Sequence, residues 1–350
     1  MARARIIVAQ VVARVAHLAL LVGLAACGGK PVTTATPPPP PATVAERMLA
    51  MLPQGAQVVI EIDLARLRAN PVVGAVVTRA LAARTADLPA GVPASPRASA
   101  EHVVLAAYGV GTAQAATLTL LAAPGALDGT TRIADGFYAV GPPDWVEQAQ
   151  QRVALATTGE AKFAIRAAPE LLELRQRAMP ANAPGSSLRV TARLSFDARI
   201  ALARQTGLDA APAQLSAWGD VVDDLALIVD CDAADPGNRS PDPKRAADAP
   251  RRLEASLRGA LSALADEPVL RLLGLPSSLV NAKLVARGSW VRTIIAIGPT
   301  HLHRVVERAV AMLRDATPDA AAPKAPAPAP SDAKAPAPPP AAAPRGNTPP

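Results

Sequence analysis

The side chains that could do acid–base or metal chemistry are few and widely spaced in this chain. After residue 26 there are three histidines: His102 begins an expected strand, while His301 and His303 lie two residues apart at the start of an expected helix. Residues two apart point to different sides of a helix, so this pair is a poor metal site. We therefore expect no metal centre built on histidine.

Two groups of aspartates come close to known site patterns. Asp230, Asp232 and Asp235 are followed by Gly237 and Asn238, but their spacing misses the Asp-x-Asp-x-Asp-Gly pattern of a calcium loop by one residue, and no glutamate follows at the bidentate position. Asp223 and Asp224 are neighbours beside an expected strand, where adjacent residues point to opposite faces and cannot form an acid–base pair. Solvated loop acids are the favoured interpretation, and a calcium loop at the first group is the alternative.

Motifs for nucleophiles and phosphates lack the context they need. Gly109-Val110-Gly111 has Gln114 where a dinucleotide loop has its third glycine, and a strand is expected to follow, not a helix. No Gly-x-Ser-x-Gly elbow occurs. Ser331 and Lys334 match a Ser-x-x-Lys pattern, but they lie in a Pro/Ala-rich segment that could not position a nucleophile. The sequence thus predicts no catalytic residue, no cofactor and no enzymatic activity.

Cys231 is the only cysteine after Cys27, so the body has no internal disulfide. It follows the apolar run from Leu225 to Val229. We expect a small, mostly buried residue near a strand end, with a reactive thiol as the alternative.

A charged N-terminus and a short apolar run precede the first cysteine. Arg3, Arg5 and Arg14 supply positive charge, and no acid occurs before Cys27. The run from Val15 to Leu24 ends in small residues. This is the pattern of an export signal, and the run is too short for a stable membrane-spanning helix.

The motif Leu24-Ala25-Ala26-Cys27 resembles the lipobox of bacterial lipoproteins. The resemblance covers this motif and the segment leading to it. It implies that Cys27 carries acyl chains such as palmitate and becomes the N-terminus after cleavage, and more than one chain is needed for stable anchoring. Gly28 stands where the family's inner-membrane retention signal has an aspartate, so we expect the outer membrane, with the body facing the periplasm. The alternative is an ordinary secreted protein or an uncleaved anchor, in which Cys27 is incidental.

Charge and composition argue against nucleic acid as a partner. The formal charge is +7, and the three arginines of the signal leave +4 on the rest of the chain, without a block of basic residues. Aromatic residues make up only 2% of the chain, too few to provide a platform on which bases could stack.

Two segments rich in proline and alanine flank a body with enough apolar residues for a sizeable core. The first is expected to be a tether of about 50 Å, and the second a disordered tail. The expected organisation is a signal peptide at 1–26, a lipid anchor and tether at 27–43, a first module at 44–155, a connecting helix and linker at 156–187, a second module at 188–314 and the tail at 315–350.

Two short sequence motifs of the body each occur twice, in the same order. Phe137–Pro142 is matched by Ile294–Pro299, and each runs into an expected helix. Glu61-Ile62-Asp63 is matched by Ser195-Phe196-Asp197, each before a helical turn. The sequence therefore predicts an α+β fold of two tandem pseudo-repeated modules, in which antiparallel strands pack with helices. Chance similarity of alanine-rich segments is the alternative.

Hydrophobic period and turn residues place the elements within the modules. Strands are expected at 58–62, 102–108, 116–122, 136–140, 163–166, 188–196, 221–231, 279–286 and 290–297. Helices are expected at 44–52, 64–68, 71–81, 144–153, 169–179, 198–204, 251–265 and 300–313, with loops at 89–96 and 233–250. Asn70, Asp144 and Thr300 are the expected N-caps of three of these helices.

These observations favour a non-enzymatic, lipid-anchored protein of the bacterial cell envelope that acts as a binding or scaffolding element. Its expected partners are the membrane, through lipid on Cys27, and an envelope protein or the cell wall. A periplasmic carrier or receptor that holds a small or apolar ligand between the modules is the alternative. An enzyme of an unrecognised type is the third possibility, because dispersed sites leave no local motif.

Overall fold

The computed structural model describes residues 43–82, 99–157, 169–181, 183, 185–206, 208, 211–233 and 243–316. The predicted signal, lipidation site and nearly all of the two Pro/Ala-rich flanks lie outside these residues, as do the expected loop at 89–96 and the expected strand at 163–166. Within the described residues, helices pack with one large antiparallel sheet, which confirms the predicted α+β class.

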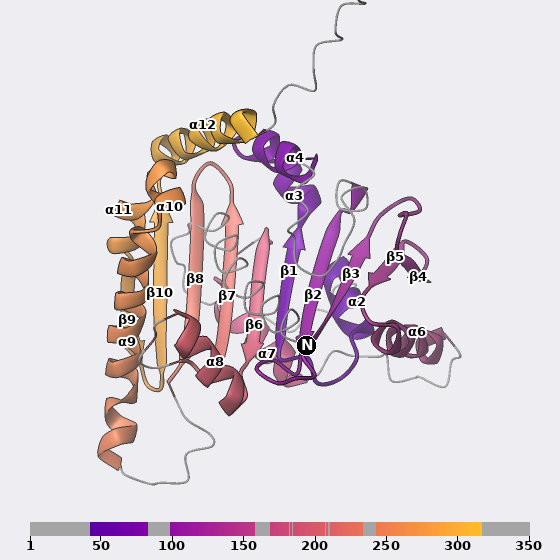
Figure 1. Cartoon of the computed structure of the whole chain (residues 1–350), viewed down its shortest axis with the longest axis horizontal. Helices are drawn as coiled ribbons and strands as arrows, with labels where there is room; N and C mark the ends of the chain where they lie inside the picture. Colours follow the sequence, from indigo (N-terminus) through magenta and orange to yellow (C-terminus); the bar gives the residue numbers. More distant parts are fainter. Residues whose placement is uncertain are drawn as a thin grey trace, which may run out of the picture.

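The sheet of the described chain has ten strands in the order β4-β5-β3-β2-β1-β6-β7-β8-β10-β9 (Figure 1). The strands are β1 (Val58–Asp63), β2 (His102–Tyr108), β3 (Ala116–Ala122), β4 (Thr131–Ala134), β5 (Phe137–Val140), β6 (Leu188–Arg193), β7 (Gln214–Val221), β8 (Leu225–Asp232), β9 (Lys283–Arg287) and β10 (Trp290–Ile297). The helices are α2 (Val44–Met51), α3 (Leu64–Ala69), α4 (Gly74–Ala82), α6 (Pro143–Thr157), α7 (Pro169–Arg177), α8 (Phe196–Thr206), α9 (Pro243–Ala265), α10 (Pro268–Leu273), α11 (Pro276–Val280) and α12 (Pro299–Ala316).

Counted outward from the centre, the two halves of the sheet have the same strand order. The first half runs β1-β2-β3-β5-β4 and the second β6-β7-β8-β10-β9. At the centre β1 pairs antiparallel with β6, from Val58 opposite Ala192 to Ile62 opposite Leu188. The halves therefore share one continuous sheet, and the idea that they arose as repeats stays a prediction.

The first helix after the opening strand of each half reaches a hairpin of the other half. Asn70, directly after α3, donates its side-chain amide to the carbonyls of Val221 and Val222 at the β7–β8 turn. In return, α8 lies against the β2–β3 turn, where a Cβ on Gly111 would be 2.9 Å from the Ala198 backbone. These two contacts join the halves in addition to the β1–β6 pairing.

Both faces of the sheet bury apolar side chains. Residues directly opposite across antiparallel strands share a face, so the register places Val59, Thr191, Ser216 and Asp230 on one face, which we call face A. On face A, α2 and α6 cover the first half through Met48, Leu49, Val146 and Ala149. On the opposite face, face B, the second half packs against α9 to α12 through Leu253, Leu270, Leu279 and Leu302.

Most expected strands and helices occur, but the interval 221–231 is not one strand. Val222, Asp223 and Asp224 form a turn between β7 and β8, and β7 was not expected at all. Two adjacent acids are poor strand residues, and they suit a turn that exposes both of them. The expected strand at 279–286 is also too long, because α11 occupies its first two residues.

Helix starts differ from the expected positions. The loop predicted at 233–250 is wrong from Pro243 onward, because α9 begins there and contains Pro250. After Asn70 the chain makes a turn before α4 begins, although the Asn70 side-chain oxygen accepts from the amides of Val72 and Val73 as a cap would. The predicted caps Asp144 and Thr300 lie one residue inside α6 and α12.

Candidate functional site

Face A of the sheet gathers charged side chains close to the junction of the two halves. Glu61 on β1 accepts two hydrogen bonds, of 2.7 and 2.9 Å, from the guanidinium of Arg175 on α7. Each side chain is only 7% exposed, and Glu46 on α2 lies 3.5 Å from Arg175. Burial alone would lower the pKa of Arg175, but the hydrogen bond and charge of Glu61 raise it above its ordinary value. The arginine is therefore held as a cation and joins three elements.

A second buried carboxylate lies where β7 ends. Asp220 accepts from the Nε of Arg66 on α3 at 2.7 Å and from the hydroxyl of Ser187 at 2.7 Å. The hydrogen bond to Asp220 raises the pKa of Arg66 above its ordinary value. This pair links a helix of the first half to a strand of the second, whereas the first pair links a strand of the first half to α7.

The third group lies farther out on face A, in the second half of the sheet. Asp230 on β8 accepts from Arg292, directly opposite on β10, at 2.8 and 2.7 Å. The guanidinium carbon of Arg177 lies 3.6 Å from the centre of the Trp290 ring, and the Arg177 Nε lies 3.9 Å from Oδ2 of Asp230. This aromatic contact and the carboxylate hold both arginines against the sheet.

The segment that contains Asp230, Asp232 and Asp235 gives no support to the alternative of a calcium loop. Asp230 is bound to Arg292, Asp232 is 9% exposed, and Asp235 lies outside the described residues. Within the ranges that the structure describes, no group of three or more histidine, cysteine, aspartate or glutamate side chains could hold a metal ion.

Arg189 is a buried cation that forms no ion pair with a carboxylate among the residues that the structure describes. It is 9% exposed and donates to the Ser186 hydroxyl at 2.6 Å and to the Met179 sulfur at 3.1 Å. Burial and then the nearby charge of Arg175 lower the pKa of Arg189, and the charges of Glu61 and Glu46 partly offset this effect. With two arginines facing two glutamates, the cluster is close to neutral and does not make an anion site.

The predicted structural role of Cys231 fits its surroundings. The residue is 1% exposed and packs with Leu253 and Val291 on face B. Burial, and then the neighbouring charges of Asp230 and Asp232, raise the pKa of the Cys231 thiol to about 12. At neutral pH the group is a protonated thiol shielded from reagents.

The three histidines are not brought together. The His102 Nδ1 lies 3.8 Å from a carboxylate oxygen of Asp63, at one end of β2. The His301 Nε2 lies 2.7 Å from the Gly274 carbonyl oxygen, and the His303 Nδ1 lies 2.9 Å from the Pro299 carbonyl oxygen. The three histidines thus contact different groups and do not form a shared site.

The glycines at 109 and 111 form a hairpin turn and not a phosphate loop. Both have positive φ, +57° and +84°, and the turn joins β2 to β3, as the sequence predicts. The Val110 amide donates to the side chain of Gln57.

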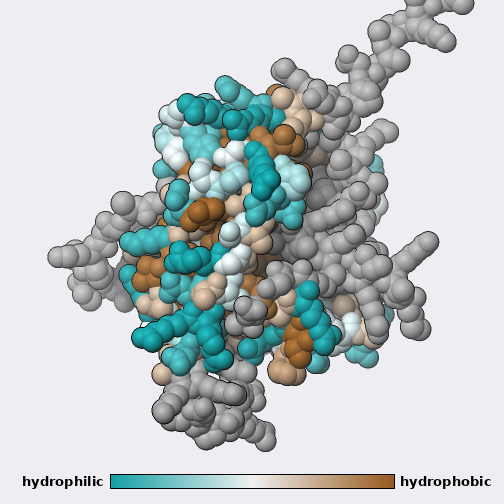
Figure 2. Space-filling model, turned by 60° about the vertical axis from the view of Figure 1, so that its left-hand side comes forward, coloured by the Kyte–Doolittle hydropathy of each residue, from teal (hydrophilic) through white to brown (hydrophobic). Residues whose placement is uncertain are grey.

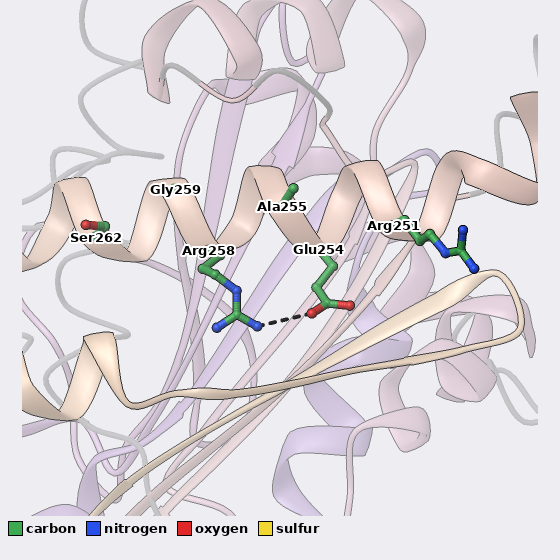
Figure 3. A pocket seen from close by; sticks show the side chains of 6 residues that line it. All are labelled: Arg251, Glu254, Ala255, Arg258, Gly259 and Ser262. Carbon is green, nitrogen blue, oxygen red and sulfur yellow. Dashed lines mark hydrogen bonds and ion pairs between the residues drawn. The ribbon is translucent and has the colours of Figure 1, made fainter.

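A shallow hollow of about 530 Å³ lies along α9 (Figure 3). It is lined by Arg251, Glu254, Ala255, Arg258, Gly259 and Ser262. In Figure 3 the Glu254 and Arg258 side chains extend from α9 on the side of the β9–β10 hairpin, and they form an ion pair of 3.1 Å. Small residues leave the hollow open, and charged residues border it.

On the face that Figure 2 shows, the apolar side chains lie in small groups separated by polar ones. The large exposed apolar side chains are Phe196, Val222, Val269, Leu272 and Val280, three of which lie on α10 and α11. Among the described helices, none is both long and apolar enough to cross a membrane.

The buried ion pairs were not found from the sequence, although a signal existed. Glu61 and Asp230 each interrupt an apolar strand at a position that alternation assigns to a covered face. A charge at such a position needs a partner, but Arg175 lies 114 residues from Glu61 and Arg292 lies 62 residues from Asp230. Neither partner can be chosen without the sheet order.

Comparisons with known proteins give no family for this chain. No protein-family model and no curated protein matches it. Among solved structures the chain is similar to crystal form I of TP0453, at 9% sequence identity and a TM-score of 0.39, over 77% of this chain and 99% of that chain. A likeness at this level supports no statement about function.

Proposed function

We propose that this chain is a lipid-anchored protein of the bacterial cell envelope that binds or scaffolds a partner and does not catalyse a reaction. The observation that carries the proposal is the cysteine motif Leu24-Ala25-Ala26-Cys27 at the end of an export-type segment. Lipid on Cys27 would hold the body within reach of the outer membrane, because residues 27–43 extend to about 50 Å.

The binding role is supported by how the charged side chains of the body are used. The buried carboxylates of Glu61, Asp220 and Asp230 are each held by an arginine, in contacts that join separate elements. Such pairs position the framework, and none leaves a carboxylate poised beside an open cavity. We favour a binding surface over a catalytic cleft for this reason.

A carrier with its ligand between the two halves is less well supported. Such a ligand needs space at the junction, whereas β1 and β6 are joined by backbone hydrogen bonds along five register pairs. Arg66 with Asp220 and Arg175 with Glu61 cross the same junction. These contacts favour a partner bound on the outside of the body over a ligand held between the halves.

The anchor is tested by labelling cells with an alkyne analogue of palmitate and fractionating their membranes. Wild type should take up label and sediment with the outer membrane, and Cys27→Ser should lose both properties. Cys231→Ser is the matched control, because it changes the other cysteine, which is buried and should carry no lipid. A wild-type chain without label would overturn the proposed anchor.

A further inference from the structure

The strand β9 ends the sheet with an open backbone edge. Its inner side pairs with β10 from Trp290 opposite Arg287 to Ile294 opposite Lys283. Among the described residues, no backbone hydrogen bond joins its outer side to another segment. An unpaired edge of this kind can accept another strand.

The hairpin geometry identifies the free groups. Only Gly288 and Ser289 connect β9 to β10, and a two-residue connection closes on a hydrogen-bonded pair, here Arg287 with Trp290. Because the pattern alternates, Leu284 and Ala286 direct their N–H and C=O groups away from β10. These two residues offer the hydrogen bonds for an added strand.

The opposite edge of the sheet is built differently. The strand β4 has four residues, and its register with β5 shifts between Arg132 and Ala134. Short length and irregular register are two ways in which proteins prevent an edge from pairing. β9 has neither protection, since it is five residues long and regular.

The side chains of β9 determine which charge an added strand should carry. Lys283 and Arg287 are exposed and share a face with Val285, because every second residue of a strand points the same way. A second copy of β9 would place cations opposite cations, which is unfavourable. A strand with acidic side chains on that face would instead form two pairs of opposite charge.

The neighbouring helix adds further positive charge and leaves room. α9 packs against β9 and β10, and its hollow is bordered by the exposed side chains of Arg251 and Arg258 together with Glu254. Glu254 pairs with Arg258 at 3.1 Å, so the charged residues of the hollow leave one net positive charge. Ala255 and Gly259 keep the hollow open, and nothing lies within 4 Å of a Cβ built on Gly259. A segment lying beside β9 would therefore meet Lys283 and Arg287 on the strand and the single net positive charge of the hollow on α9.

We propose that the outer edge of β9 binds an extended, acidic polypeptide segment, which adds to the sheet as an eleventh strand. Backbone hydrogen bonds from Leu284 and Ala286 supply the register, and Lys283 and Arg287 supply the preference for acidic side chains. The proposal rests on the binding role proposed above but not on the lipid anchor, so failure of the labelling experiment leaves it standing.

The test uses the purified full chain in detergent and two fluorescent eight-residue peptides, one alternating Glu and Val and one alternating Lys and Val. Anisotropy should show that wild type binds the acidic peptide at least tenfold more tightly than the basic one. Hydrogen exchange at the Leu284 and Ala286 amides should slow on binding. The double variant Lys283→Glu, Arg287→Glu should reverse the preference between the peptides. Arg132→Glu, on the other edge strand, is the matched control and should change nothing.

Ala286→Pro removes an outward N–H and should weaken binding of the acidic peptide at least tenfold, with circular dichroism used to show that the fold is retained. Should this variant unfold, the charge reversal decides the question alone. Equal binding of both peptides by wild type would overturn the proposal, as would unchanged affinity in a folded Ala286→Pro variant. A concentration-dependent dimer that Ala286→Pro abolishes would also overturn it, by making a second copy the occupant.

Discussion

Removing the charge of Glu61 should destabilise the whole sheet, because it would leave Arg175 buried without its carboxylate. The change Glu61→Gln keeps the size and shape of the side chain, removes the negative charge and replaces one of the two oxygens that accept from Arg175 with an NH2 group. Both side chains of the pair are 7% exposed, so water cannot replace the lost partner. The pair joins β1 to α7, so its loss should lower the free energy of global unfolding rather than cause only local fraying.

The magnitude follows from burial. Breaking a buried ion pair by removing one partner costs about 3–5 kcal/mol. Glu46 lies 3.5 Å from Arg175 and is 39% exposed, so it retains part of the attraction after Glu61 is changed. We therefore expect a loss near the lower end of that range, about 3 kcal/mol in the free energy of unfolding.

Urea unfolding followed by circular dichroism and tryptophan fluorescence measures this loss. Asp135→Asn is the matched control, because Asp135 pairs with Arg132 at the surface with side chains 98% and 64% exposed, and no shift in the midpoint is expected. The double variant Glu61→Leu, Arg175→Met should recover much of the loss, since neither charge remains buried.

Two outcomes would refute this reasoning. A Glu61→Gln midpoint equal to that of Asp135→Asn would mean that the pair behaves as a surface contact despite its burial. A double variant less stable than Glu61→Gln would mean that the ion pair is itself strongly stabilising, and that the cost does not come from an uncompensated charge.

Two further predictions concern Cys231 and Gly111. Burial raises the pKa of Cys231 from 9.0 to about 12, so the folded state keeps a proton that the unfolded state releases, and stability should fall by about 1.4 kcal/mol per pH unit between pH 9 and 12. Urea titrations at several pH values should give a steeper fall for wild type than for Cys231→Ala, and equal slopes would contradict the shift. Gly111→Ala should cost about 2–4 kcal/mol, because its φ is +84° and the new Cβ would meet the Ala198 backbone at 2.9 Å. Gly55 has a φ of +88° and open space around it, so Gly55→Ala should lose only the stability that the left-handed backbone conformation costs an alanine. Equal losses in the two variants would show that the contact with α8 is unimportant.

Local sequence was a good guide where a strand had clear ends. The hairpin of β2 and β3 was expected at 102–108 and 116–122 and has those bounds, because two apolar runs flank a turn rich in glycine. The same reasoning was wrong at 221–231. There Gln214–Val221 carries Gly219 and Asp220 and shows no strong alternation, so β7 gave no clear signal, and the turn at Val222–Asp224 was taken for strand.

Propensity also missed the short helices that only packing stabilises. α10 and α11 have six and five residues, too few to be stable alone. Leu270 and Leu279 are buried against the core, and the contacts of these side chains compensate for the entropy lost in ordering the two helices. Pro268 and Pro276 at their first positions were the available local signals.

The sequence by itself determined the α+β class, the positions of most strands and helices, and the cysteine motif from which the anchor is proposed, because each depends on residues close together in the chain. Only the tertiary structure decided that the two halves share one sheet, that Glu61 is neutralised by Arg175, and that β9 forms an edge beside α9. The physical reason is that strand order and ion pairing depend on contacts between residues far apart in sequence. Each charge could have met several partners, and the choice was made by which strands lie side by side.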